Sequence, residues 1–272
     1  MKELDKNKFG PWAIITGASS GIGKEFARQV AASGIHVVLV ARRLPLLEAW
    51  GEELAKTYGV QYRAVHADLS QPDFMDRLKH ATQDLEIGLL VSNAGTGIPG
   101  EFLSIPEELL LNIVQLNAIS HMRLVHYYGR PLIHRGYGGI VLVSAMGALD
   151  GIPYMANDAA TKAYVTSLGQ GLHVEFAQAG VHTTVVIPGP TDTPIIEKFG
   201  LDAVKLPLKP MPVEQCVAEG LAALEANHAT HLTGRLNRIM MGLIPASITR
   251  KLNGKMLSSG LINGQPRLAH LA

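Results

Sequence analysis

The chain has 272 residues, of which 47% are hydrophobic and 17% are charged, and its formal net charge is +1. This composition indicates a soluble globular protein with a large core, and the near-zero charge gives no support for nucleic acid as a partner. The single cysteine, Cys216, cannot form an internal disulfide, and we find neither a signal-peptide core nor an apolar run long enough to span a bilayer. We therefore expect a cytoplasmic protein without a transmembrane segment.

Short apolar runs alternate with helix-like segments along residues 1–190. Strands are predicted at 12–16, 36–40, 62–67, 88–92, 139–144 and 182–187, and the main helices at 21–33, 46–57, 106–127 and 157–179. Nearly continuous apolar runs are typical of strands covered on both faces, and their alternation with helices predicts right-handed crossovers. We expect an α/β fold, in which one doubly wound Rossmann-type domain has a parallel sheet flanked by helices.

No linker, repeat or low-complexity tract interrupts this pattern, so we expect one domain over 1–272. Its core should cover about 10–230, followed by a C-terminal helical extension over 231–272. Residues 226–272 contain no Asp or Glu but six basic residues, which are Arg235, Arg238, Arg250, Lys251, Lys255 and Arg267. A basic amphipathic tail of this kind can touch an anionic surface, but we expect it to close over a pocket or to pack at a subunit interface.

The first predicted strand runs directly into a glycine-rich turn, "TGASSGIG" (16–23), that opens a helix. Glycines let the backbone approach a pyrophosphate, and the helix N-terminus offers it free N–H groups. This context favours a nucleotide site over a plain loop. The residues that we expect at the nucleotide are Gly17, Ser19, Ser20, Gly21, Ile22 and Gly23.

The wide spacing of these glycines resembles the turn of the short-chain dehydrogenase/reductase family, and further motifs follow in that family's order over about 10–230. "HADLS" supplies Asp68 and Leu69, which the resemblance places at the adenine. "VSNAG" resembles the family's Asn-Asn-Ala-Gly segment, with Ser92 in place of the first Asn. By resemblance it adds three cofactor residues, Asn93, Ala94 and Gly95. "PGPTDTP" resembles the loop that holds the nicotinamide, through Pro188, Gly189, Thr191 and Thr193.

The second predicted strand ends in Arg42 and Arg43, where an NAD-preferring site would have an acidic residue for the ribose 2′-hydroxyl. A guanidinium group suits a 2′-phosphate, which a carboxylate would repel. The alternative is that both arginines are solvated residues at the end of a strand. We expect NADP(H) as the cofactor.

The resemblance also implies a catalytic set made of an asparagine, a serine and a Tyr-x-x-x-Lys pair. Asn117, Ser144 and Lys162 fill three of these positions, and Lys162 should also contact the cofactor. The residue four places before Lys162 is Asp158, where the family has its tyrosine. An aspartate has a pKa near ~4, and a neighbouring lysine lowers that pKa further. We therefore expect a carboxylate at neutral pH, which cannot protonate a ketone, and hence an atypical active site.

Three interpretations of Asp158 remain open. In the first, which we favour, its charge stabilises a cation, and the enzyme is an NADP(H)-dependent oxidoreductase acting on an imine, an iminium or a similarly activated C=X bond. In the second, the fold supports a redox-neutral reaction, as a cyclase, isomerase, pericyclase or lyase that uses Asp158. In the third, Asp158 only pairs with Lys162 in a helix capped by Asn157, and the protein is a catalytically disabled nucleotide-binding relative.

The substrate cleft should lie beyond the carboxyl ends of the strands, between residues 96–103, 145–155 and 194–212. These segments are mostly apolar, so we expect a hydrophobic, natural-product-like small molecule and a role in biosynthesis. The pocket residues that we expect are Met146, Tyr154, Met155 and Phe199. The histidines show no metal-ligand spacing, so we expect no metal. The resemblance implies a homodimer or homotetramer joined through the helices at 106–127 and 157–179.

Overall fold

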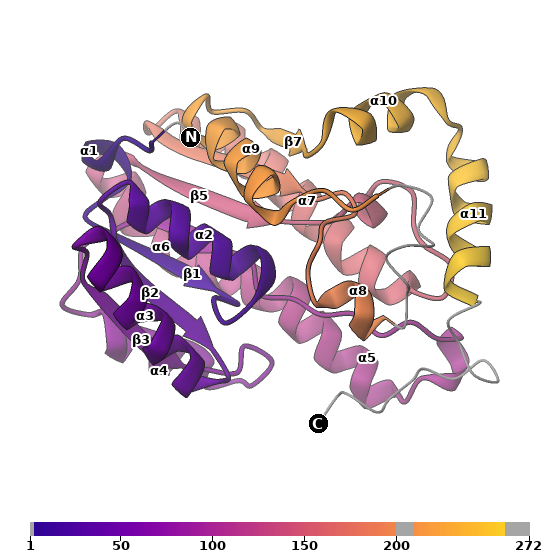
Figure 1. Cartoon of the computed structure of the whole chain (residues 1–272), viewed down its shortest axis with the longest axis horizontal. Coiled ribbons are helices and arrows are strands. Elements are labelled where there is room, and N and C mark those ends of the chain that lie inside the picture. Colours follow the sequence, from indigo (N-terminus) through magenta and orange to yellow (C-terminus); the bar gives the residue numbers. More distant parts are fainter. Residues whose placement is uncertain (1–2, 200–208, 259–272) are drawn as a thin grey trace.

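Seven parallel strands form a single sheet at the centre of the molecule, in the order β3-β2-β1-β4-β5-β6-β7 (Figure 1). The computed structural model describes residues 3–199 and 209–258, so part of the expected wall 194–212 and Arg267 of the tail lie outside it. The strands are β1 (Trp12–Thr16), β2 (His36–Ala41), β3 (Tyr62–His66), β4 (Ile87–Ser92), β5 (Gly138–Val143), β6 (Val181–Ile187) and β7 (Thr230–Leu232). All six predicted strands are present, and the predicted α/β class is confirmed.

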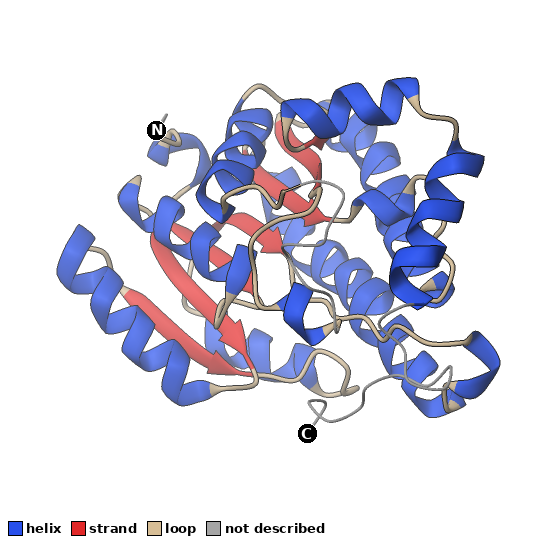
Figure 2. Cartoon of the chain, turned by 45° about the vertical axis from the view of Figure 1, so that its right-hand side comes forward, coloured by secondary structure: helices blue, strands red, loops and turns tan. Residues whose placement is uncertain are grey.

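Helices cover both faces of the sheet (Figure 2). One face carries α2 (Gly21–Ala32), α3 (Leu44–Tyr58) and α9 (Val213–Glu225), and the other carries α4 (Phe74–Thr82), α6 (Ser120–Arg135) and α7 (Ala156–Ala177). Neighbouring residues of one strand enter opposite cores: Ile15 lies in the core with Phe26 of α2, and Ile14 lies in the core with Phe74 of α4. Because both faces are buried, the strands are apolar throughout.

The chain reverses direction across the sheet after β3, because β4 pairs with β1 on the side opposite β2. A crevice opens where strand order reverses, at the carboxyl ends of β1 and β4. The glycine-rich turn follows β1, and the segment 93–95 follows β4. The fold therefore brings the two motifs to the same edge of the sheet.

The segment predicted as one helix over 106–127 is built from three consecutive pieces. These are α5 (Glu107–Val114), the π-helical turn η2 (Gln115–Ile119) and then α6. A π turn inserts one extra residue and is frequent at functional sites. Here it carries Asn117, whose side chain is fully buried.

The C-terminal extension first continues the sheet and only then becomes helical. β7 lies across the expected boundary at 230/231 and pairs with Val185–Ile187 of β6. Two helices follow, α10 (Arg235–Leu243) and α11 (Ala246–Ser258), at the side of the molecule toward which the strands point (Figure 1). The described ranges contain no helix that is both long and apolar enough to cross a membrane.

The remaining helical segments are short. They are α1 (Lys6–Phe9), η1 (Phe102–Ser104), η3 (Met146–Ala148) and α8 (Ile195–Lys198). η3 and α8 directly follow β5 and the Pro-Gly loop, so both lie at the carboxyl edge of the sheet, where the crevice opens.

Candidate active site

The glycine-rich turn is shaped so that only glycine fits at its key positions. Gly17 and Gly21 have positive φ angles of 70° and 53°, which residues with a Cβ rarely adopt. A Cβ on Gly23 would collide with the carbonyl oxygen of Gly17 and lie 2.5 Å from Asn93 Nδ2. Ser20 precedes α2 without capping it through its side chain, so the first N–H groups of α2 are left for another acceptor. This cradle fits a phosphate group.

Thr16 joins the ends of β1 and β4. Its hydroxyl oxygen accepts hydrogen bonds from the backbone N–H groups of Asn93 and Ala94, both at 2.9 Å, and Asn93 Nδ2 donates to the Thr16 carbonyl at 2.9 Å. The sequence pattern identifies Thr16 only as the start of the glycine-rich turn and does not predict this role. A polar residue at the end of a buried apolar strand is the signal that could have shown it.

His121 of α6 contacts both ends of the turn from Ser92 to Ala94. Its Nδ1 lies 2.9 Å from Ser92 Oγ and its Nε2 lies 3.1 Å from the Ala94 carbonyl oxygen. Burial, together with the charge of Lys162, lowers the pKa of His121 to about 3, so the ring is neutral at physiological pH. Ser92, where the family motif has asparagine, is thus one half of a buried pair with His121.

The two arginines after β2 lie exposed at the open end of the crevice, and Arg43 Nη2 donates to Ser19 Oγ at 3.0 Å. Asp68 Oδ1 accepts from the backbone N–H and hydroxyl of Ser70 at 3.0 and 2.7 Å, which closes the turn after β3. The Leu69 side chain is buried in the core, so this residue can offer a ligand only its backbone. Together with the glycine cradle, these groups fit a dinucleotide.

The Pro-Gly loop is held between the segment after β5 and the helical tail. The Met146 backbone N–H donates to the Pro188 carbonyl at 3.1 Å, and Thr191 Oγ1 donates to the Gly189 carbonyl at 2.9 Å. Asn237 of α10 packs so tightly on Gly189 that a Cβ there would collide with its side-chain amide. The extension therefore supports a loop that we expect at the nicotinamide.

The extension also contacts the segment 145–155. A Cβ on Gly254 of α11 would lie 3.3 Å from the Pro153 ring, and Thr249 Oγ1 donates to Asp150 Oδ2 at 3.2 Å. α11 thus lies on one expected wall of the substrate cleft.

Three of the expected catalytic residues gather around the first turns of α7. Asn117 Oδ1 accepts from the Thr96 N–H at 3.0 Å, and its Nδ2 donates to the Thr96 carbonyl at 2.7 Å and to Thr161 Oγ1 at 3.3 Å. Lys162 Nζ donates to the Val143 carbonyl at 2.9 Å. Ser144 Oγ donates to the Lys162 carbonyl at 2.9 Å.

Asp158 occupies the first turn of α7 and is only 7% exposed. Its Oδ1 has no hydrogen-bond partner and faces Gly97, since a Cβ on that glycine would lie 2.6 Å from this oxygen. The same point is 2.6 Å from Met155 Cε and 3.0 Å from Phe199 Cζ. A buried carboxyl group and two expected pocket residues, from the start of α7 and from the end of α8, therefore converge on Gly97.

The expectation that Lys162 lowers the pKa of Asp158 below its usual value is wrong, because this pKa is raised instead. Burial raises the pKa of Asp158 to about 7, and the backbone N–H of Ile98 and the charge of Lys162 offset that effect only partly. Burial likewise lowers the pKa of Lys162 to about 8. Desolvation outweighs the attraction between the two side chains, so a large fraction of Asp158 is a neutral carboxylic acid near neutral pH.

The third interpretation of Asp158 predicts an ion pair with Lys162 and a helix cap by Asn157, and the structure contains neither. No ion pair within 4.0 Å joins Asp158 to Lys162, two residues that the structure describes. Asn157 does not cap α7, because the helix begins at Ala156 and Met155 precedes it. Asn157 Nδ2 instead donates to the Leu110 carbonyl at 3.1 Å, which ties α7 to α5.

Tyr154, the remaining expected pocket residue, is half-buried and has a φ angle of 64°, unusual for a residue with a side chain. Its carbonyl accepts from the Gly100 N–H at 2.8 Å, which connects two of the expected cleft walls. Over the ranges 3–199 and 209–258, no three His, Cys, Asp or Glu residues form a group that could hold a metal ion.

A family model described as short chain dehydrogenase matches residues 11–203. The chain belongs to the short-chain dehydrogenase family. A 7beta-hydroxysteroid dehydrogenase from Mediterraneibacter gnavus is 31% identical over 189 residues, which are 70% of this chain and 72% of that protein. A structure solved to explain 7beta-hydroxysteroid dehydrogenase stereoselectivity has a TM-score of 0.83 at 26% identity, with 92% of this chain and 98% of that chain covered.

A second structural relative is a short-chain dehydrogenase from Sphingobium yanoikuyae in complex with NADPH. It has a TM-score of 0.78 at 30% identity and covers 94% of this chain and 97% of that chain. The predicted family is therefore confirmed, and the chain is an oxidoreductase of the short-chain dehydrogenase family with a nicotinamide cofactor.

Proposed function

We propose that this short-chain dehydrogenase uses NADP(H) to reduce a C=O or C=N bond in a bulky hydrophobic substrate, with Asp158 as the proton donor in place of a tyrosine. The observation that carries the proposal is the carboxyl group of Asp158. It is buried, has an unpaired oxygen, and its pKa is raised to about 7 by burial. A group with a pKa near the working pH is suited to general acid catalysis.

In this proposal the glycine-rich turn and the first N–H groups of α2 bind the diphosphate, and Arg42 and Arg43 bind the 2′-phosphate. The segment 93–95 and the Pro-Gly loop hold the rest of the dinucleotide. When bound, the nicotinamide supplies the hydride. The exposure of both arginines and the bond from Arg43 to Ser19 support NADP(H) over NAD(H).

Reduction of a C=O or C=N bond requires a proton in addition to the hydride, and Asp158 supplies this proton. As the substrate carbon gains hydride, the O–H bond of Asp158 breaks and its proton goes to the substrate oxygen or nitrogen. The carboxylate left behind lies near the positive charge of Lys162, which stabilises it. Since neutral Asp158 can donate a proton, a ketone is no longer excluded. An imine remains suitable, because its nitrogen accepts the proton before hydride transfer.

A bulky apolar substrate is supported by the groups around Asp158 and by the relatives. Met155 and Phe199 lie against the same spot as the carboxyl group, and α11 packs over the wall at Pro153. Two of the relatives named above are described as 7beta-hydroxysteroid dehydrogenases. We propose a rigid polycyclic molecule of steroid size.

NADPH oxidation in the presence of steroid ketones and matched cyclic imines tests the proposal. We expect the unchanged chain to turn over, with a rate that falls above about pH 7 as Asp158 loses its proton. Asp158→Asn should lose roughly 10²-fold or more in kcat, because an amide cannot donate this proton to a substrate and recover it. An Asp158→Asn variant that keeps both the rate and the pH profile would contradict the proposal.

The bonding of Ser144 and Lys162 favours a second candidate, a dinucleotide-binding protein without turnover. The Ser144 hydroxyl donates its only proton to the Lys162 carbonyl, so it has none left for a substrate, and the Val143 carbonyl holds one of the three protons of the Lys162 ammonium group. For this candidate we expect the unchanged chain to bind the cofactor but to show no NADPH oxidation with any substrate in the same assay. Turnover of ketones would then appear only in Asp158→Tyr.

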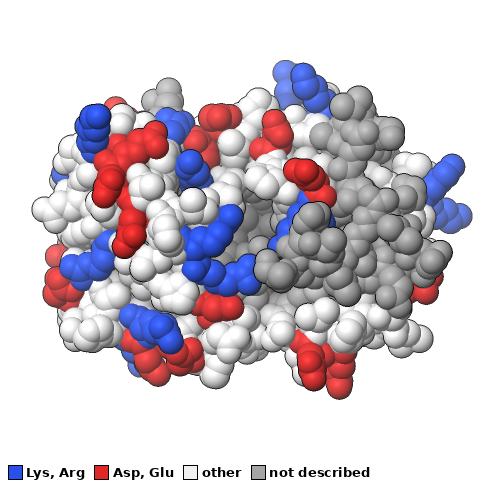
Figure 3. All heavy atoms as spheres, turned by 60° about the horizontal axis from the view of Figure 1, so that its bottom comes forward, with Lys and Arg blue, Asp and Glu red and all other residues white. Residues whose placement is uncertain are grey.

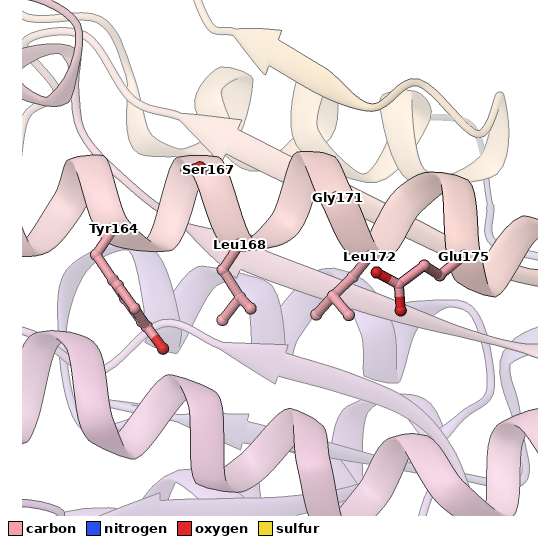
Figure 4. Close-up of a pocket in the computed structure, with 6 residues that line it drawn as sticks. All are labelled: Tyr164, Ser167, Leu168, Gly171, Leu172 and Glu175. Carbon is pink, nitrogen blue, oxygen red and sulfur yellow. The ribbon is translucent and has the colours of Figure 1, made fainter.

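We also propose that the protein forms a homodimer or homotetramer through α7. A groove of about 280 Å³ runs along this helix and is lined by Tyr164, Ser167, Leu168, Gly171, Leu172 and Glu175 (Figure 4). The side chains of Tyr164, Leu168 and Leu172 point to the same side of the helix. Val174 on the same helix is 63% exposed. An apolar helix face of this kind suits a second copy of α7.

A further inference from the structure

The segment 193–199, which contains α8, crosses from the phosphate-binding turn to the loop after β4. At its start, a Cβ on Gly21 would lie 3.3 Å from Thr193 Cγ2 and 4.0 Å from Pro194 Cδ. At its end, the Phe199 ring reaches Gly97. The segment therefore lies over the crevice in which the dinucleotide is expected.

Lys198 is the basic residue that this segment carries into the crevice. Its side chain is half-buried, and Nζ donates to Thr96 Oγ1 at 3.1 Å. Thr96 directly follows the segment 93–95, whose Asn93 is bonded to Thr16 at the start of the glycine-rich turn. The Lys198 ammonium group is thus held beside the path of the cofactor rather than in open solvent.

Two further positive charges lie near Lys198. Burial and the charges of Arg42 and Arg43 both lower the pKa of Lys198. In the described part of the chain, no ion pair joins any of these three residues to a carboxylate. Figure 3 shows Lys and Arg side chains on both sides of a hollow in this face of the molecule. Like charges that converge without a protein counter-ion indicate a site for an anion.

We propose that Lys198 binds a phosphate oxygen of the dinucleotide and thereby fastens α8 over the bound cofactor, as the third cation beside Arg42 and Arg43. This inference rests on the proposed NADP(H) cofactor. It adds a contact from a segment that lies outside the glycine-rich turn and outside the Pro-Gly loop. An ammonium group has three donors, so Lys198 can keep its bond to Thr96 while it binds an anion. The phosphate is either the 2′-phosphate beside the arginines or the diphosphate at the turn.

Dissociation constants for NADP⁺ and NAD⁺, measured by titration calorimetry without substrate, test the proposal independently of turnover. Lys198→Met keeps a long unbranched side chain but removes the positive charge, whereas Lys198→Arg keeps the charge. The matched control is Lys56→Met, at an exposed position of α3. Thermal unfolding of the cofactor-free variants confirms that each is folded.

We expect Lys198→Met to weaken NADP⁺ binding by roughly tenfold or more, as for loss of a hydrogen bond to a charged group. Lys198→Arg and Lys56→Met should stay within about threefold of the unchanged chain. A loss for NADP⁺ alone assigns the contact to the 2′-phosphate, and an equal loss for both dinucleotides assigns it to the diphosphate. Unchanged affinity of Lys198→Met for both overturns the proposal.

The outcome is separable from that of the proposed function. A chain whose NADP⁺ binding depends on Lys198 but which reduces no substrate leaves this inference standing and contradicts the reductase. A chain that reduces ketones or imines while Lys198→Met binds both dinucleotides normally does the reverse. Failure of the unchanged chain to bind either dinucleotide overturns both.

Discussion

At Asp158, burial and a neighbouring charge act on one carboxyl group in opposite directions. The apolar surroundings of Met155 and Phe199 penalise the carboxylate form, and Lys162 favours it. Lys162 itself is weakened as a counter-ion, because burial lowers its own pKa to about 8. Between about pH 7 and pH 8 the two groups are therefore both partly charged. Groups in this state are suited to proton transfer.

The raised pKa of Asp158 also makes stability depend on pH. The unfolded carboxyl group titrates near ~3.9 and the folded one at about 7, so the folded state holds a proton that the unfolded state has released. Stability should fall as pH rises between these two values and then level off. Asp158→Asn removes this dependence, so its melting temperature should exceed that of the unchanged chain at about pH 8 and match it more closely at about pH 4.

Thermal unfolding at the two pH values checks this prediction, with Asp76→Asn on the exposed face of α4 as the control. That control should change stability little at either pH, since exposed charge pairs contribute about 0–1 kcal/mol. Equal pH dependence of Asp158→Asn and the unchanged chain would show that Asp158 is ionised in the fold.

At the level of elements, Glu219 of α9 connects the sheet edge to the helical extension. Its Oε2 accepts from the Gly234 N–H at 2.9 Å and from Arg238 Nη1 at 2.9 Å, and it lies 3.1 Å from His231 Nε2. Burial opposes ionisation, but these bonds and that of Gln215 lower the pKa of Glu219 to about 2. One carboxylate thus fixes the junction between β7 and α10.

Glu219→Ala should destabilise the protein by about 1–3 kcal/mol, because the Gly234 N–H and two side chains lose their shared acceptor. The stabilisation is present above the unfolded pKa near ~4.3 and is lost as pH falls toward 2, since protonation removes the charge. Urea unfolding at neutral pH measures the effect. Glu214→Ala, an exposed position in the first turn of the same helix, is the control and should cost much less.

At the scale of the whole molecule, the groove on α7 leads to a test of assembly. A Cβ on Gly171 would meet nothing within 4 Å, so a lysine there is accommodated in the monomer and improves helix propensity. In an interface built on α7, two such lysines would place bulk and like charge at the contact. We expect the unchanged chain to be a dimer or tetramer by light scattering and Gly171→Lys to be a smaller species that remains folded. An unchanged mass of Gly171→Lys would place the interface elsewhere.

The sequence predicts the sheet well because each strand is a separate apolar run bounded by polar turns. It misses α4, α9 and β7, whose polar or short segments give a weaker pattern. The π turn at Asn117 is also missed, because one inserted residue changes the backbone without changing composition.

For the candidate site, the motifs locate the glycine cradle and the residues around α7, but they misjudge the protonation of Asp158. Spacing shows that Lys162 is near, whereas desolvation depends on Gly97, Met155 and Phe199, which reach the carboxyl group only in three dimensions. Lys198 is missed for the same reason, since Thr96 and Arg42 lie far from it in the sequence.

The extension after β7 has a consequence for how such a protein can diverge. α11 packs on Pro153, at one wall of the expected substrate cleft, whereas the sheet and the phosphate-binding turn are formed by residues that precede this part of the chain. Exchange of α11 between homologues is therefore a route to a new range of substrates with the same redox partner. Such an exchange leaves α10 in place, so the amide of Asn237 still packs on Gly189 in the loop expected at the nicotinamide.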